Sequence, residues 1–158
     1  MSNIKTIYDF DELTSNITSF SHAYLFNVNS LEKAFPFIKI FARRIICPNS
    51  YQENCSNECD ICRLIDNNIY DDLYIVNPKT VGINIDEIEN LFDYMGKKSL
   101  RPDGKRVYII YGFERLSKNI SNKILKFLEE PSDNIYALLM TENINQILTT
   151  IISRCQVI

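Results

Sequence analysis

The sequence predicts an α/β domain built on a mostly parallel sheet, and two features of its apolar residues carry that prediction. Short apolar runs alternate along the chain with segments whose apolar residues recur every three or four positions. Such runs are typical of buried strands and such segments of amphipathic helices, so the alternation indicates βαβ units with helices on both faces of a sheet. A chain of 158 residues with 46% hydrophobic content can bury one core, and we predict one domain, residues 1–158.

The expected elements follow from these two patterns. The apolar runs that predict strands are His22–Val28, Leu73–Val76, Arg106–Tyr111 and Ile135–Met140. The segments that predict helices are Tyr8–Phe20, Ser30–Ile46, Ile85–Met95, Ser117–Leu128 and Asn143–Ile152. Ser117 and Asn143 are of the residue types that cap helix N-termini, and Pro131 is expected to stop the helix before it.

Charge and hydropathy exclude two classes of protein. A net charge of −3 argues against a polycationic protein that coats nucleic acid. No apolar run approaches the roughly 18 residues that span a bilayer, and the N-terminal residues lack a signal-peptide pattern, so we expect a cytoplasmic protein with no membrane partner. One basic segment is expected to be a solvated loop that could contact DNA only through phosphates: Lys97, Lys98, Arg101, Lys105 and Arg106.

Four of the five cysteines are clustered in a polar, loop-like segment of sixteen residues. Their pattern is Cys-x7-Cys-x3-Cys-x2-Cys, formed by Cys47, Cys55, Cys59 and Cys62. Tetrahedral Zn²⁺ takes four such thiolate ligands, although some of these cysteines could instead be buried thiols. We predict a zinc module at residues 47–62. Four protein ligands leave no position for water, so the metal is expected to be structural.

Two further motifs, read together with the four cysteines, indicate a family. They are Ser121–Pro131, which reads SNKILKFLEEP, and Ser153-Arg154-Cys155. Over His22–Ile158 the chain resembles the nucleotide-binding domain of bacterial DNA polymerase III clamp-loader subunits, the delta prime and gamma/tau proteins of the AAA+ superfamily. The resemblance implies a RecA-like AAA+ parallel sheet with a four-cysteine zinc insertion after the first helix. The family's lid and collar domains are expected to be absent from these 158 residues.

The phosphate-binding loop of that family is degenerate here. Its G-x-x-x-x-G-K-[ST] pattern falls on the segment from Asn27 to Phe35. The resemblance aligns the family's three glycines with Val28, Leu31 and Lys33. It aligns the phosphate-binding lysine with Ala34 and the magnesium-binding Ser/Thr with Phe35. Bulky residues do not readily adopt the backbone angles of the glycines, and an aromatic ring does not bind Mg²⁺. Lys33, one position from the expected lysine, is interpreted as a solvated helix residue.

The second nucleotide motif is altered as well. After their third strand, ATPases of the family place Asp and Glu to organise magnesium and water. This chain has Tyr111 at the Asp position, followed by Gly112, Phe113 and Glu114. With both motifs changed, we expect no bound ATP and no ATPase activity of the chain's own.

Arg154 is the candidate functional residue that remains. The resemblance implies an arginine finger, which reaches in trans into the ATP site of a neighbouring subunit. From the residues alone, a structural arginine paired with a carboxylate is the more common role. A lost ATP site beside a retained arginine is the pattern of delta prime subunits. The implied partners are gamma/tau and delta subunits, the sliding clamp indirectly, and primed DNA at the level of the complex.

Two alternatives stay open at this point. A gamma/tau-type ATPase with a divergent phosphate loop would bind nucleotide measurably. A zinc-stabilised interaction module unrelated to replication would leave a partner's ATPase rate unchanged when Arg154 is removed.

Overall fold

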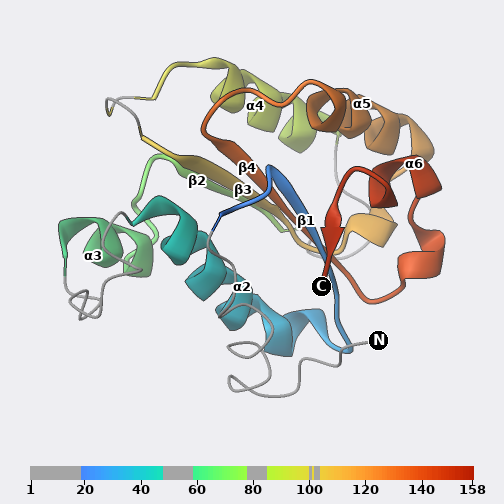
Figure 1. Ribbon diagram of the computed structural model, residues 1–158, viewed down its shortest axis with the longest axis horizontal. Coiled ribbons are helices and arrows are strands. Elements are labelled where there is room, and N and C mark those ends of the chain that lie inside the picture. Colours follow the sequence, from blue (N-terminus) through green and yellow to red (C-terminus); the bar gives the residue numbers. More distant parts are fainter. Residues whose placement is uncertain (1–18, 48–58, 78–84, 100, 102–103) are drawn as a thin grey trace.

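The centre of the molecule is a five-stranded sheet in which every pair of neighbouring strands is parallel (Figure 1). The structure is a computed structural model that describes residues 19–47, 59–77, 85–99, 101 and 104–158. The strands are β1 Ala23–Asn27, β2 Leu73–Val76, β3 Arg106–Ile110, β4 Ile135–Thr141 and β5 Gln156–Val157, in the order β2-β3-β4-β1-β5. This architecture confirms the predicted α/β fold.

Helices cover both faces of the sheet, as the sequence predicted. The α-helices are α2 Leu31–Ile46, α3 Asp60–Asp66, α4 Ile85–Gly96, α5 Lys118–Glu129 and α6 Thr149–Ile152, with 3₁₀ turns η1 Phe113–Arg115 and η2 Ile144–Gln146. Figure 1 shows α2 and α3 on one face and α4, α5 and α6 on the other. Side chains of a strand alternate between faces. On β1, Tyr24 and Phe26 therefore join the core under α2, while Ala23 and Leu25 join the core under α4, α5 and α6.

The four predicted strands are present, and the fifth was missed. β5 contains only two residues, both exposed, so it has no apolar run by which it could be recognised. Backbone contacts place it beside β1: the Ile158 amide donates to the Leu25 carbonyl at 3.0 Å, and the Asn27 amide donates to the Ile158 carbonyl at 2.9 Å.

The predicted helix Asn143–Ile152 is wrong in one respect, because the segment forms two short turns, η2 and α6. Asn143 does cap the first of them, accepting from the Asn145 amide at 3.2 Å. The backbone then becomes extended at Ile147, with φ −89° and ψ 138°. This break still lets Ile147 and Ile151 both reach the core, which explains why their spacing appeared helical.

The other helix predictions stand as follows. Ser117 caps α5 by accepting from the Ile120 amide at 3.3 Å, as predicted. The segment around Cys62 is less loop-like than expected, because α3 begins at Asp60. The predicted helix Tyr8–Phe20 lies almost wholly outside the described residues.

Among the residues that the structure does describe, no helix has the length and apolar character needed to cross a membrane.

The predicted basic loop is wrong for Arg106, which is buried. This residue is 5% exposed and opens β3. Its Nε lies 3.2 Å from Oδ1 of Asp72, a residue that is also 5% exposed, and its Nη1 donates to the Met95 carbonyl at 3.0 Å. Lys105 is placed differently, with Nζ 5.7 Å from the ring centroid of Phe20. The segment is therefore partly structural.

Candidate functional site

The carboxyl ends of three adjacent strands meet at one edge of the sheet. β1 leads into Ser30 and α2, β3 leads into Tyr111, and β4 leads into Glu142. Ligands of open parallel α/β sheets bind in the crevice beyond these ends. This edge is therefore where a nucleotide site belongs, and it contains both degenerate motifs.

The first turn of α2 occupies the segment where a phosphate loop is expected. The helix begins at Leu31, with Ser30 as its N-cap, so only residues 28–30 connect it to β1. Two of the three expected glycine positions, Leu31 and Lys33, are consequently helical. Leu31 is 1% exposed and Ala34 3% exposed, since both pack into the core, whereas Lys33 is exposed. Val28 is buried as well.

Three backbone amides of this turn already have partners within the chain. The Leu31 amide donates to Oε1 of Glu142 at 2.8 Å. The Lys33 amide donates to Oγ of Ser30 at 3.3 Å, and the Ala34 amide to the Ser30 carbonyl at 3.0 Å. Helix N-termini attract anions through such amides and through the helix dipole. Here the anion is a carboxylate of the protein itself.

Glu142 was not identified from the sequence. A weak signal existed, because an acidic residue directly after a buried strand lies at the edge where sites form. Its own amide donates to Oε1 of Glu114 at 3.3 Å, which ties η1 to the end of β4. Nothing in the sequence indicated that the carboxylate would reach across to α2, because the pair is 111 residues apart.

The two positions that the resemblance aligns with magnesium-binding residues carry aromatic rings that touch. Phe35 and Tyr111 pack edge to face, with ring centroids 5.6 Å apart and planes at 85°. Burial raises the pKa of the Tyr111 hydroxyl; Arg115 opposes this shift, while Glu32 and Glu142 add to it. The phenol therefore stays neutral at physiological pH and is a poor ligand for Mg²⁺. The two rings therefore contribute packing to this edge of the sheet.

Three of the four predicted zinc ligands are brought together, and the fourth, Cys55, lies outside the described residues. The Sγ atoms of Cys47, Cys59 and Cys62 all lie within 4.8 Å of one another. Cys47 follows α2 directly, and Cys59 is the N-cap of α3, with its Sγ 3.4 Å from the Cys62 amide. The two helix ends thus hold the thiols in place.

The spacing of these thiols fits a tetrahedral thiolate site. Zn–S bonds of ~2.3 Å at tetrahedral angles separate the sulfurs by about 3.8 Å. The Sγ atoms of Cys47 and Cys59 are 3.6 Å apart. Cys155 is not part of the cluster in this structure. Burial raises the pKa of its thiol to about 12.

Arg154 lies just beyond α6, where two groups hold its guanidinium. Nη2 is 2.9 Å from Oε1 of Glu129, and Nη1 donates to the Thr150 carbonyl at 2.8 Å. Its side chain remains 35% exposed. Arg154 is thus both paired with a carboxylate and partly accessible from outside.

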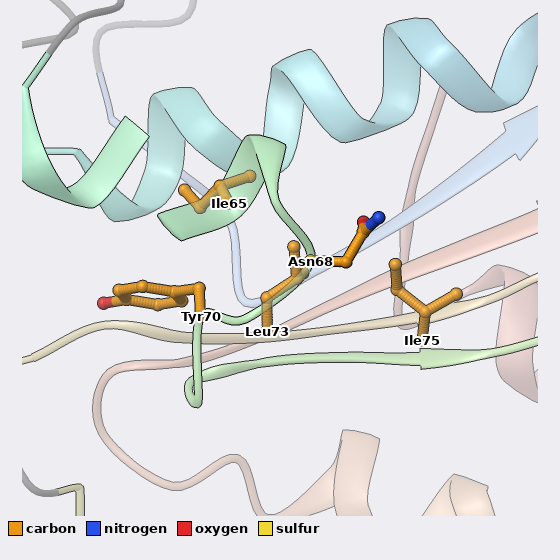
Figure 2. A pocket seen from close by; sticks show the side chains of 5 residues that line it. All are labelled: Ile65, Asn68, Tyr70, Leu73 and Ile75. Atoms are coloured by element: carbon orange, nitrogen blue, oxygen red, sulfur yellow. The ribbon is translucent and has the colours of Figure 1, made fainter. Parts of the chain in front are cut away.

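A cavity of about 270 Å³ lies elsewhere, between α3 and the edge strand β2 (Figure 2). Its lining residues are Ile65, Asn68, Tyr70, Leu73 and Ile75. The side-chain amide of Asn68 is already bonded, because its Oδ1 accepts a hydrogen bond from Lys39 Nζ at 2.9 Å. No acid, base or nucleophile converges in this lining, so the cavity has no catalytic character.

Comparisons with known proteins show what the fold and the sequence are similar to. A solved gamma-subunit-related protein of DNA polymerase III from Thermotoga maritima shares the fold, with a TM-score of 0.67, 20% identity and coverage of 94% of this chain and 44% of that one. DNA polymerase III subunit delta' of Bacillus subtilis is 35% identical over 136 residues, 86% of this chain and 41% of the relative. Subunit tau of Bacillus subtilis is 34% identical over 139 residues, 87% of this chain and 24% of the relative.

The fold and the similarity to these curated relatives define a domain of the clamp-loader subunit class. A family model described as "DNA polymerase III, delta subunit" matches residues 5–158, and the chain belongs to that family as a subunit of the delta prime type. It spans well under half the length of these relatives.

Proposed function

We propose that this chain is the AAA+ domain of a clamp-loader subunit that neither binds nor hydrolyses ATP and that donates Arg154 to a neighbouring ATPase subunit. The observation that carries the proposal is the arrangement of residues at the carboxyl ends of β1, β3 and β4, where the family binds nucleotide. There the Leu31 amide at the start of α2 donates to Glu142, and the two positions aligned with the family's magnesium ligands carry the packed rings of Phe35 and Tyr111. A nucleotide would have to displace contacts that the folded chain already makes.

The partners follow from the family. We propose that the subunit assembles with gamma/tau and delta subunits in the cytoplasm and takes part in loading a sliding clamp onto primed DNA. An arginine finger contributes on the order of 10³-fold or more to phosphoryl transfer, because a fixed positive charge stabilises the transition state. The partly exposed side chain of Arg154 is the group in the described chain that supports this role.

Zinc is the proposed cofactor, held by Cys47, Cys59 and Cys62 together with Cys55. The thiols join the end of α2 to the start of α3, so the metal would crosslink two elements of the fold. A site with four protein ligands contributes stability and no catalysis. We propose that residues 47–62 form this module within a single domain.

One experiment separates this proposal from the gamma/tau alternative, which the similarity to subunit tau favours. The protein is titrated with ATP and Mg²⁺ in a calorimeter at concentrations that detect millimolar binding. No heat of binding is expected. Stoichiometric binding would make an ATP-hydrolysing subunit the better assignment.

The donor role is tested in a reconstituted loader. Arg154→Ala is expected to slow the neighbouring subunit's ATPase by about 10³-fold. An unchanged rate would show that the chain acts as an interaction module instead.

A further inference from the structure

The guanidinium of Arg154 has two anchors that come from different elements. Glu129 is the last residue of α5, and Thr150 belongs to α6. Figure 1 shows α5 and α6 side by side on the same face of the sheet, where both contribute to one core. The anchors are thus held by packed elements of the fold, and each binds a different terminal nitrogen of Arg154.

These contacts use only part of the guanidinium. An arginine head group has five N–H donors, and the two anchors take one from each terminal nitrogen. Nη1 also lies 3.5 Å from Oγ of Ser153, at the limit of hydrogen bonding. Within the part of the chain that the structure describes, Nε has no acceptor, so donors remain for an incoming oxyanion.

We propose that Glu129 is a positioning residue for Arg154, which orients the guanidinium before the neighbouring subunit is present. This inference rests on the donor role proposed above for Arg154. An arginine side chain has many rotamers, and one whose rotamers are restricted before binding loses less entropy when it contacts a phosphate. Glu129 and the Thr150 carbonyl together supply that restriction.

Glu129 could instead hold Arg154 away from the neighbouring subunit. The exposure of the ion pair argues against this inhibitory role. The side chains of Arg154 and Glu129 are 35% and 43% exposed. Ion pairs this accessible are screened by solvent and shift an equilibrium by roughly two- to five-fold at most. That is enough to bias rotamers and too little to hold an arginine away from a polyphosphate.

The test uses the whole subunit in a loader reconstituted with its ATPase partners, sliding clamp and primed DNA. Glu129→Gln is expected to lower the neighbour's kcat by roughly two- to five-fold with little change in KM, because the exposed ion pair biases the rotamers of Arg154 by no more than that and misorientation of a catalytic group affects the transition state. Glu129→Asp should recover part of this loss. Glu130→Gln removes the adjacent charge and should leave kcat unchanged.

A second background separates positioning from a general structural effect. In Arg154→Ala, the additional change Glu129→Gln should have no further effect on kcat. An equal further loss would overturn the inference, because Glu129 would then act independently of Arg154. An unchanged or faster rate for Glu129→Gln alone would overturn it too.

The same series distinguishes the two proposals. If Arg154→Ala leaves the neighbour's rate unchanged, the donor role fails and the positioning role fails with it. If Arg154→Ala slows the reaction and Glu129→Gln does not, only the positioning role fails.

A measurement on the chain without partners completes the test. Nitrogen NMR of the Arg154 guanidinium should show hindered rotation in the unaltered protein and faster rotation in Glu129→Gln. Equal rotation rates in the two proteins would show that Glu129 does not hold the group.

Discussion

Asp72 and Arg106 form an ion pair that is buried between the beginnings of two neighbouring parallel strands. Their register places them side by side, since Leu73 pairs with Val107 one position further along. Oγ of Ser99 also donates to Oδ2 of Asp72 at 2.8 Å, and the Arg106 guanidinium lies 4.9 Å from the ring centroid of Tyr94. The pair therefore joins β2, β3 and the segment after α4.

Breaking this pair should strongly destabilise the fold. Asp72→Ala leaves a buried, unpaired guanidinium, and we expect the free energy of unfolding to fall by about 3–5 kcal/mol. Urea denaturation measures the change. The control is Glu89→Ala, which breaks the exposed Lys123–Glu89 pair, with side chains 44% and 56% exposed, and should cost less than about 1 kcal/mol. Similar losses in both variants would contradict this account of Arg106.

The Glu142 carboxylate should stabilise the first turn of α2 mainly through its charge. Glu142→Gln keeps an acceptor for the Leu31 amide but removes the charge at the helix N-terminus, and we expect a loss of about 0.3–1 kcal/mol. The loss should shrink in high salt. The control is Glu130→Gln, which removes a negative charge from the C-terminal end of α5 and should therefore be neutral or slightly stabilising. A loss that is independent of salt would mean that charge is not the cause.

The contact between Phe35 and Tyr111 should appear as a coupling free energy. In a double-mutant cycle with Phe35→Ala and Tyr111→Ala, the two losses of unfolding free energy should differ from additivity by about 0.5–1.5 kcal/mol. Chemical denaturation of the four proteins gives this value. Strict additivity would show that the rings fill the corner without stabilising each other.

Metal removal should destabilise the region between α2 and α3. Purified protein is expected to contain zinc by elemental analysis, and Cys59→Ser or a chelator should remove the metal and lower the melting temperature. Cys155→Ser is the matched control because its thiol lies outside the cluster, and it should retain the metal. Protein purified under metal-retaining conditions that contains no zinc would contradict the prediction.

Cys155 should be an unreactive thiol that weakens the fold only at high pH. Burial raises its pKa from 9.0 to about 12, so the folded state keeps a proton that the unfolded chain releases. The stability that depends on this difference is fully present below about pH 9 and is lost as the pH rises to about 12. Cys155→Ser should flatten the pH dependence of stability in this interval.

The alkylation rate provides an independent measure of the same shift. At pH 9, iodoacetamide should modify Cys155 far more slowly in the folded protein than in urea, because the thiolate is the reactive form. Equal rates would show that burial does not protect the thiol.

Most helices and strands could be predicted from short stretches of sequence, because packing against a sheet requires a regular pattern of apolar residues. β1, β2, β3 and β4 are apolar runs, and α2, α4 and α5 repeat their apolar residues at helical spacing, since each must bury one face. The exceptions are short elements. β5 has two residues, and α6 has four, so neither is long enough to show a period.

In the candidate site, too, the residue types could be predicted from the sequence and the long-range contacts could not. The side chains of Ala34, Phe35 and Tyr111 do not bind phosphate or Mg²⁺ well wherever they lie, and the four cysteines have the type and spacing from which a metal site is predicted. What the resemblance could not give is the partners of these groups. Glu129 beside Arg154 and Glu142 at α2 are contacts between residues distant in sequence.

Residue types and local periods were enough to predict the parallel α/β architecture and the family. These properties depend on residue type and local period, which every segment carries independently. Three contacts became visible only in three dimensions: Arg106 is buried beside Asp72, Glu142 accepts from the first amide of α2, and Glu129 pairs with Arg154. Electrostatic pairing depends on distance and burial, and the fold sets both by bringing together strand and helix ends that are far apart in the chain.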